Sequence, residues 1–447
     1  MKRTAWRYLW SAHDIRRKLL ITLLILAIYR FASHVPVPGA DKDVMAAIMG
    51  TGGAASNLIN ILDLLSGGTV SRFSVMAMGV YPYITAQIIL QLLTPIIPSM
   101  QRRMEEDPRE GQKWQEKWTY YLAVPMAALQ AIGQVNIFNS TATQIGLPPV
   151  IENFGLDYFL SSIAIVISMT AGTMFAIWLG ELISEYGLRN QGLSLIIFAG
   201  IVARIPVTFQ GIFADETTRW IGLIFMLVLS LVTIFAIVVV QQGRRNVPVM
   251  YPGRRMGSRM SMPVKGTLPL MVNMAGMIPI IFAQSLLTFP SIIASFFTNS
   301  SNETIANFAT SMVTTFGGTG NAYWIIYFFM VVFFSFFYTD VLFAQQNYGE
   351  NLKKVGAQIP GVSRGAPTQK YLTRVLRRIT LPGAVFLGVV AVLPWLVGLI
   401  VPFGKSTGLL LTSSSGLLIV VGVVRDTFFS IDADLKLHGY DDSLLVR

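Results

Sequence analysis

The run IGLIFMLVLSLVTIFAIVVV, residues 221–240, decides the fold class of this chain of 447 residues. It contains no charged residue, and it has about the 20 positions that an α-helix needs to cross the hydrocarbon core of a bilayer. The run does not alternate between polar and apolar residues, as a strand of a membrane β-barrel would. Lipid offers the backbone no hydrogen-bond partner, so such a segment must be helical. The chain is therefore predicted to be an all-α membrane protein.

Similar apolar segments recur along the whole chain, and its composition agrees: 53% of the residues are hydrophobic and 13% are charged, against about a quarter charged in soluble domains. Ten transmembrane helices are predicted, five in residues 1–210 and five in residues 211–447. An odd number of spans in each half gives the halves opposite topology, as in an inverted repeat. The predicted spans are 19–35, 73–94, 118–138, 158–179, 191–209, 219–241, 268–289, 322–344, 376–400 and 407–429.

The net charge of +11 is distributed unevenly along the chain. Lys and Arg gather at the N-terminus, in the loop after span two, and in two strongly basic loops at about 242–267 and 345–375, whereas the loops after spans three and seven contain neither residue. Cytoplasmic loops carry such an excess of cations, which predicts a multi-pass protein of the cytoplasmic membrane with both termini in the cytoplasm. The basic loops could also contact lipid head groups or an acidic partner.

The segment LINILDLL, residues 58–65, lies between the first two spans and is too short to cross a membrane. Ser66, Gly67 and Gly68 follow it, and span two begins soon after. Two structures fit this pattern: a re-entrant half-helix on the outer side of the membrane, and an amphipathic helix on its surface.

Several chemistries are excluded by the residues present. The chain has no cysteine, which excludes disulfides, thiolate metal sites and cysteine nucleophiles. Gly404-Lys405-Ser406-Thr407 resembles the end of a phosphate-binding loop, but Leu399 stands where that loop needs its first glycine. Asp, Glu and Lys are missing from the span centres, which argues against proton or sodium coupling. A channel, a transporter of a neutral solute and a membrane scaffold remain.

Several longer motifs occur in a fixed order and at characteristic distances. They are LLSGG (64–68), MGVYPYI (78–84), GTMF (172–175), NMAGMIP (273–279) and NLKK (351–354). Together, over nearly the whole chain, they resemble the SecY family, the channel subunits of the bacterial protein-export translocase. The resemblance implies two pseudo-symmetric inverted halves around a pore for unfolded secretory polypeptides. It also implies a lateral gate between spans two and seven, through which membrane segments pass into lipid.

The resemblance further implies a ring of six apolar side chains that closes the waist of the pore. Aliphatic groups give ions and water no hydrogen-bonding partner, and their non-directional contacts fit around varied polypeptides. By motif position the ring residues would be Val80, Ile84, Leu193, Ile197, Ile281 and Ile419.

In the same family a short re-entrant helix before span two plugs the pore, and the segment at about 57–72 would be this plug, with a glycine pair that supplies the freedom to move. Three polar residues on the gate helices, Gln91, Gln130 and Asn273, are candidates for a cluster that holds the gate closed. The plug and hinge residues would be Leu58, Ile61, Leu62, Leu65, Gly67, Gly68 and Arg72.

The resemblance also implies partners, but no catalytic residue, metal or cofactor. A SecE subunit would clamp the two halves and a SecG subunit would accompany it. The basic loops would receive the SecA motor or the ribosome, whose RNA suits polybasic segments. The partner-binding residues would be Arg254, Arg255, Arg259, Lys353, Lys354 and Arg364.

Two departures from the family pattern concern these regions. Residues 360–365 read PGVSRG where the family usually reads PGIRPG, so the arginine is displaced by one position to Arg364. Met271 stands where a lysine commonly precedes span seven.

Overall fold

The computed structural model describes most of the chain, and all structural statements below concern these residues. They are 13–50, 59, 63, 66, 68–94, 96–152, 154–155, 158–189, 191–214, 219–252, 255–256, 259–260, 264–297, 302–316, 320–400 and 413–437.

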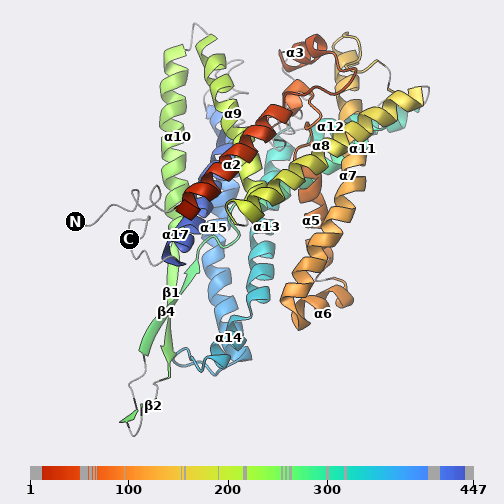
Figure 1. Ribbon diagram of the computed structural model, residues 1–447. Helices are drawn as coiled ribbons and strands as arrows, with labels where there is room; N and C mark the ends of the chain where they lie inside the picture. The colour runs from red at the N-terminus through yellow and green to blue at the C-terminus, as the bar shows by residue number, and fades with distance from the viewer. Residues whose placement is uncertain are drawn as a thin grey trace.

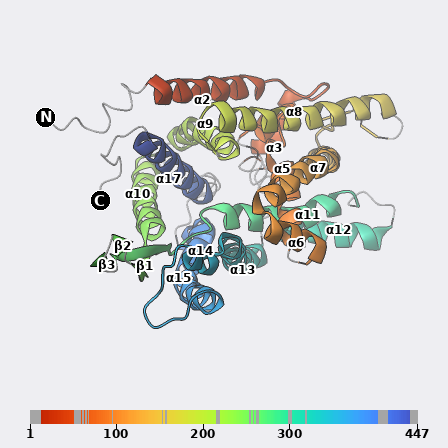
Figure 2. The ribbon, with the colours of Figure 1, turned by 60° about the horizontal axis from the view of Figure 1, so that its bottom comes forward.

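The first half of the chain is helical, and its long helices α2, α8 and α9 lie together on one side of the molecule (Figure 2). Its elements are α2 (His13–Ala32), α3 (Lys42–Gly50), the 3₁₀-helix η1 (Val70–Arg72), α5 (Tyr81–Leu93), α6 (Pro98–Glu106), α7 (Pro108–Gln144), α8 (Phe159–Tyr186) and α9 (Gly192–Ala214).

The second half adds a further group of helices and a long β-hairpin that projects from one end of the bundle (Figure 1). Its elements are α10 (Arg219–Gln242), β1 (Arg244–Tyr251), β2 (Arg255–Met256), β3 (Arg259–Met260), β4 (Val264–Met271), α11 (Ile278–Ser295), α12 (Glu303–Phe316), α13 (Asn321–Gln346), α14 (Tyr348–Lys354), α15 (Ala366–Ile400) and α17 (Ser413–Leu437).

Membrane-crossing helices dominate both halves. Within the described residues, six helices are long and apolar enough to cross a membrane, and α5 with α6 makes a seventh span if this pair, bent by 98°, counts as one. These match seven of the predicted spans, from the second to the fourth and from the sixth to the ninth. The remaining three predicted spans overlap α2, α9 and α17, which are helical but do not meet the same test of length and hydropathy. The full count of ten therefore stays a prediction.

The predicted starts of spans two and seven are wrong, because α5 begins only at Tyr81 and α11 only at Ile278. In each case a glycine with positive φ precedes the helix, Gly79 at 51° and Gly276 at 64°. This backbone conformation suits glycine and interrupts a helix. A proline follows in the first helical turn, where its missing N–H costs no hydrogen bond.

The two helix starts are copies of one motif. GVYP at 79–82 and GMIP at 276–279 share the left-handed glycine and the proline three residues later. Ile84 and Ile281 each lie five residues after that glycine. This repetition, which is too short to stand out in the sequence, relates the two halves of the chain and supports the inverted repeat.

The first basic loop is not an irregular loop. β1 and β4 pair antiparallel from Arg244 opposite Met271 to Tyr251 opposite Val264. β4 thereby takes residues that the hydropathy pattern assigned to span seven. Pairing with β1 satisfies the backbone of this apolar stretch outside the bundle, so helix formation is not needed there.

Candidate functional site

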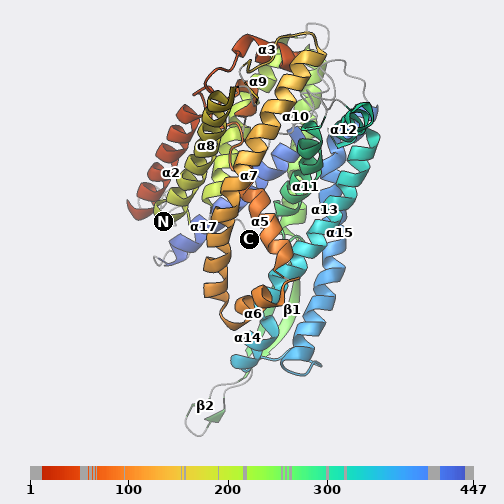
Figure 3. The same ribbon diagram turned by 90° about the vertical axis from the view of Figure 1, so that its right-hand side faces the viewer.

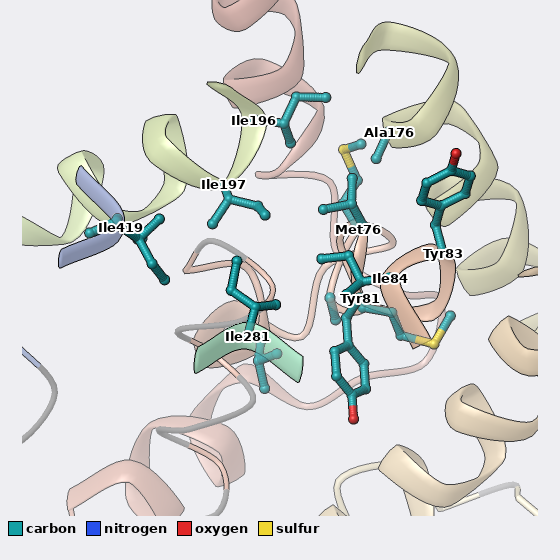
Figure 4. Close-up of a cluster of buried hydrophobic side chains, with 14 of the residues drawn as sticks. Met76, Tyr81, Tyr83, Ile84, Ala176, Ile196, Ile197, Ile281 and Ile419 are labelled. Carbon is teal, nitrogen blue, oxygen red and sulfur yellow. The ribbon is translucent and has the colours of Figure 1, made fainter. Parts of the chain in front are cut away.

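The centre of the bundle holds four isoleucines from four helices and from both halves of the chain. Ile84 of α5, Ile197 of α9, Ile281 of α11 and Ile419 of α17 point toward one common space (Figure 4). They are 8%, 6%, 6% and 1% exposed and belong to the main hydrophobic core. A closure of this kind offers no hydrogen bond to an ion or a solute. A carrier of a neutral solute would need polar groups at this level.

The other two predicted ring residues, Val80 and Leu193, are on the same two helices as Ile84 and Ile197 or directly precede them. Val80 is 1% exposed and directly precedes α5. Leu193 is half-buried, and its side chain lies against Gly180 of α8. The structure therefore does not place Leu193 at the common space, and its role in the ring stays a prediction.

Adjacent residues of α9 face different surroundings. Ile197 points toward the common space, whereas Ile196 points toward Ala176 of α8 and Met76 (Figure 4). Ile196 also lies close to Gly180. Because the two residues are chemically identical and similarly buried, this pair provides a matched control for experiments on the ring.

A polar seam runs between α5, α7 and α11. The Tyr81 hydroxyl of α5 donates a hydrogen bond to the backbone oxygen of Ser285 on α11 at 3.0 Å. The Gln130 amide of α7 donates to Thr85 Oγ1 of α5 at 3.4 Å. Buried contacts of this kind hold membrane helices together. The seam thus links the helices that correspond to spans two, three and seven.

In the same seam, α7 and α11 pack closely at Gly133. A Cβ atom at Gly133 would lie 2.4 Å from Ile292 Cγ2, so a larger residue there would force the Ile292 side chain to shift. The Ser295 hydroxyl reaches the Gly133 carbonyl oxygen at 3.5 Å. Small residues at helix crossings allow such packing in membranes.

Within the described residues, no hydrogen bond joins the three predicted gate residues to one another. Gln130 belongs to the seam, but the Asn273 amide donates to the Gly276 carbonyl oxygen at 3.0 Å, within the turn before α11. Gln91 lines a separate cavity of about 210 Å³ with Tyr338. Each of the three is buried or half-buried, and their common role in a gate stays a prediction.

Most of the seam was not predicted from the sequence. Tyr81 belongs to the motif MGVYPYI and Thr85 directly follows it, but no role was predicted for either residue. On α11, polar residues recur at helical spacing and form one face, which was a usable signal. These residues are Gln284, Thr288, Ser291 and Ser295, all at most 4% exposed.

Only some of the polar side chains in the seam have hydrogen-bond partners. Within the described residues, the side-chain oxygens of Gln134, Gln284 and Ser291 have no hydrogen-bond partner. Partly satisfied buried networks hold less firmly than fully satisfied ones. The seam can therefore keep α5 and α11 together without preventing their separation.

Replacing Tyr81 by phenylalanine is expected to loosen this seam. The substitution keeps the ring and removes the hydrogen bond to Ser285, which contributes about 0.6 kcal/mol at the average for interhelical contacts in membranes. A change of this size corresponds to roughly threefold in an equilibrium constant. For the protein-export channel that the resemblance implies, transport of a precursor with a weakened signal sequence into inverted membrane vesicles should rise by about this factor. Tyr323→Phe is the control, since Tyr323 is also buried but lies on α13; an equal gain there would contradict the role of the seam.

The predicted plug is described only in part. Leu58, Ile61, Leu62, Leu65 and Gly67 lie outside the described residues. The described positions are firmly held. The Tyr29 hydroxyl of α2 donates to the Ser66 carbonyl oxygen at 3.2 Å, and the backbone N–H of Ser71 donates to Asp63 Oδ1 at 2.9 Å.

Gly68 and Arg72 are the plug residues that the structure describes. Gly68 has φ of 82°, a conformation that favours glycine, and its N–H donates to the Asp63 carbonyl oxygen at 2.7 Å. Arg72 ends η1. The plug role of this segment stays a prediction.

The described residues of the two basic loops, together with a few flanking residues, form one unit at the end of the bundle, here called the platform: residues 244–252, 255–256, 259–260, 264–271 and 343–379. Met250 and Gln358 exchange backbone hydrogen bonds of 2.8 and 2.9 Å, which tie the hairpin to the second loop. A small hydrophobic core of its own lies beneath them. Its buried members are Val247, Val249, Leu270, Phe343, Ala357, Ile359, Leu372 and Leu376.

The predicted partner-binding residues lie on this platform or outside the described residues. Lys353 and Lys354 end α14, and Arg364 lies in the following turn; all three are exposed. Arg255 and Arg259 belong to the short strands β2 and β3 of the hairpin that projects farthest from the bundle (Figure 3). Arg254 is outside the described residues.

Comparison with known proteins gives one consistent result. The SecY family profile matches residues 74–428. Among the relatives, the protein translocase subunit SecY of Streptomyces scabiei is 36% identical over 447 residues, covering 99% of both chains. The subunit of the same name from Aquifex aeolicus is 38% identical, covering 97% of both chains. That of Mycobacterium tuberculosis is 39% identical, covering 96% of this chain and 97% of the relative.

Solved structures with the same fold are more distant in sequence. One, described as a protein-conducting channel, has a TM-score of 0.58 and 18% identity, and covers 99% of this chain and 100% of its own. Another is of a SecY protein whose plug domain stabilises the closed state of the translocation channel. It has a TM-score of 0.60 and 17% identity at the same coverage. The fold agrees with the relationship that the sequences establish over nearly the full length, and the chain belongs to the SecY family.

Proposed function

We propose that this chain is the pore-forming subunit of a protein translocase, a passive channel for unfolded secretory polypeptides. Its family is one of translocation channels and not of enzymes. The observation that carries the proposal is the convergence of Ile84, Ile197, Ile281 and Ile419, from both halves of the chain, on one space. Aliphatic side chains can seal a pore against ions and still yield to a passing chain of any sequence.

The polar seam gives the channel a lateral gate. It joins α5 and α7 of the first half to α11 of the second half. The hydrophobic helix of a signal sequence would compete for this crevice, because the bonds that close it are few and weak. Membrane segments would leave through the same opening into lipid.

The platform suits the partners that supply energy. Its exposed cations Lys353, Lys354 and Arg364, together with the projecting hairpin, would bind the SecA motor in one mode and the ribosome, including its RNA, in the other. SecE and SecG would complete the complex. The cation excess of this end supports an orientation in which it lies, together with both termini, on the cytoplasmic side of the cytoplasmic membrane.

Disulfide trapping tests the pore directly, because the chain has no cysteine of its own. Ile197→Cys and Ile281→Cys, each in a separate variant, are combined with an arrested precursor that carries one cysteine in its translocating segment. The assay uses energised vesicles with SecE and SecA. Crosslinks to both positions are expected during translocation and are expected to vanish without ATP.

The matched control is Ile196→Cys, which sits one position away and faces α8. It should crosslink at least tenfold less, since its side chain does not point to the common space. If Ile196→Cys crosslinks as well as Ile197→Cys, or if neither ring position crosslinks, polypeptide does not pass through this space and the proposal fails.

A further inference from the structure

Outside the pore, the structure has a groove at the cytoplasmic end of α15. It has a volume of about 910 Å³ and lies between α14 and the first turns of α15. Five cations line it together with one acid, Glu350. The cations are Lys353, Lys370, Arg374, Arg377 and Arg378, and Leu381 lies at the apolar end of the groove.

The two walls of the groove, α14 and the start of α15, are held together by direct contacts. A Cβ atom at Gly349 would lie 2.7 Å from the Gly365 carbonyl oxygen, so α14 sits directly against the start of α15. The Gly349 N–H donates to Gln369 Oε1 at 2.8 Å across the same contact. These contacts fix α14 and α15 relative to each other, so the backbone positions from which the side chains of the groove extend are also fixed.

Most of the positive charge in the groove is not neutralised. Arg377 is held by Asp340 of α13, with a closest distance of 2.9 Å. Within the described residues, Lys370, Arg374 and Arg378 form no salt bridge, and all three are exposed. An anion with more than one acceptor oxygen would satisfy arginines in this arrangement.

The groove continues into an apolar stripe on the same helix. Arg378 is the last charged residue of α15, which has none from Ile379 to Ile400. Leu381, Val385 and Val389 follow at intervals of four residues, so they share one face, and they are 57%, 41% and 40% exposed. From Arg378 to Val389 the helix rises about 16 Å, close to half of the roughly 30 Å hydrocarbon thickness.

We propose that this groove binds the head group of an anionic phospholipid from the cytoplasmic leaflet, with an acyl chain along Leu381, Val385 and Val389. The phosphodiester would lie between Arg374 and Arg378, and Lys370 would contribute its charge from one turn below. The stripe faces lipid, as expected for a helix that crosses a membrane. Lys370, Arg374 and Arg378 continue the same face of α15 at intervals of four residues, so their charges lie at the level of the lipid head groups and not toward a partner in solution. The stripe, directly continuous with the charges and as long as one leaflet, favours lipid.

The test is lipid binding to the purified SecY, SecE and SecG complex in neutral detergent, followed by native mass spectrometry. Dioleoylphosphatidylglycerol is compared with dioleoylphosphatidylcholine as the neutral lipid. In the double variant Arg374→Gln/Arg378→Gln, the apparent Kd of the tightest phosphatidylglycerol site should rise about tenfold. The reason is that each cation near an anionic head group contributes to the affinity for the lipid. The matched control is Arg244→Gln/Arg245→Gln on β1, with the same loss of charge on exposed residues, and it should keep that site unchanged.

A second variant separates the lipid from a free phosphate compound. Val385→Ser/Val389→Ser keeps every charge and should weaken phosphatidylglycerol binding severalfold. Competition with glycerol 3-phosphate should require far higher concentrations than competition with the lipid. The proposal is overturned if the groove variant binds phosphatidylglycerol as the control does, or if the stripe variant is unchanged. It is also overturned if glycerol 3-phosphate competes as well as the lipid, or if only SecA or ribosome binding falls.

Discussion

Ion leakage through the resting channel is expected to rise at least tenfold when Ile84 and Ile281 are both replaced by alanine. The two side chains face the common space from α5 and α11, one in each half. Truncation removes the branched ends that close it, and a wider apolar constriction admits water and ions more readily. The current across planar bilayers that contain the reconstituted complex, without precursor or motor, is the measurement.

The matched control for this variant is Ile183→Ala/Ile196→Ala. Both residues are at most 1% exposed and belong to the same hydrophobic core, so the volume and burial lost are comparable. Each truncation should lower the free energy of unfolding by about 2–5 kcal/mol. The ion current through the resting channel should nevertheless stay unchanged. Equal currents in the two double variants would show that leakage follows from general loosening, and the ring would then not be the seal.

The largest effect on folding is expected from Gly192→Ala. An added Cβ would lie 1.7 Å from the Gly180 carbonyl oxygen, a backbone atom that cannot rotate away. The crossing of α8 and α9 would have to open, and Ile197 lies on the second of these helices. The free energy of unfolding is expected to fall by about 3–5 kcal/mol, at the high end of what single substitutions cause. Thermal unfolding of the complex in detergent measures it.

Gly422→Ala provides the comparison. Gly422 also lies inside a helix, α17, but its nearest neighbour is the flexible side chain of Met277, with Sδ at 3.3 Å from the added Cβ. This variant should melt within a few degrees of the unchanged protein. If Gly192→Ala melts at the same temperature as Gly422→Ala, the close crossing of α8 and α9 does not limit stability.

Local composition determined most of the helices. Span six was expected at 219–241, and α10 runs from Arg219 to Gln242. This agreement has a simple reason: in lipid, an uncharged run of this length has no alternative to a helix. The ordered motifs likewise pointed to the family, because their spacing is a property of the chain itself.

The breaks in the helices needed the tertiary structure. Residues 268–271 were assigned to span seven by their hydropathy, but they belong to β4 and pair with β1, which a hydropathy window does not detect. The turns at Gly79 and Gly276 depend on a positive φ at each glycine. A glycine in the sequence permits this conformation but does not require it. Their equivalence became visible only once both φ values were known to be positive.

For the side chains of the site, too, the sequence determined some properties and the tertiary structure determined others. The sequence by itself determined that isoleucines occupy 84, 196, 197, 281 and 419, and the resemblance selected four of them for the ring. Only the packed structure decided that Ile197 faces the common space while Ile196 faces α8. It also decided that Tyr81 of α5 bonds across to α11, whereas Asn273 bonds within the turn before that helix. Composition and spacing act within one segment, whereas the direction of a buried side chain is decided by the helices that pack against it.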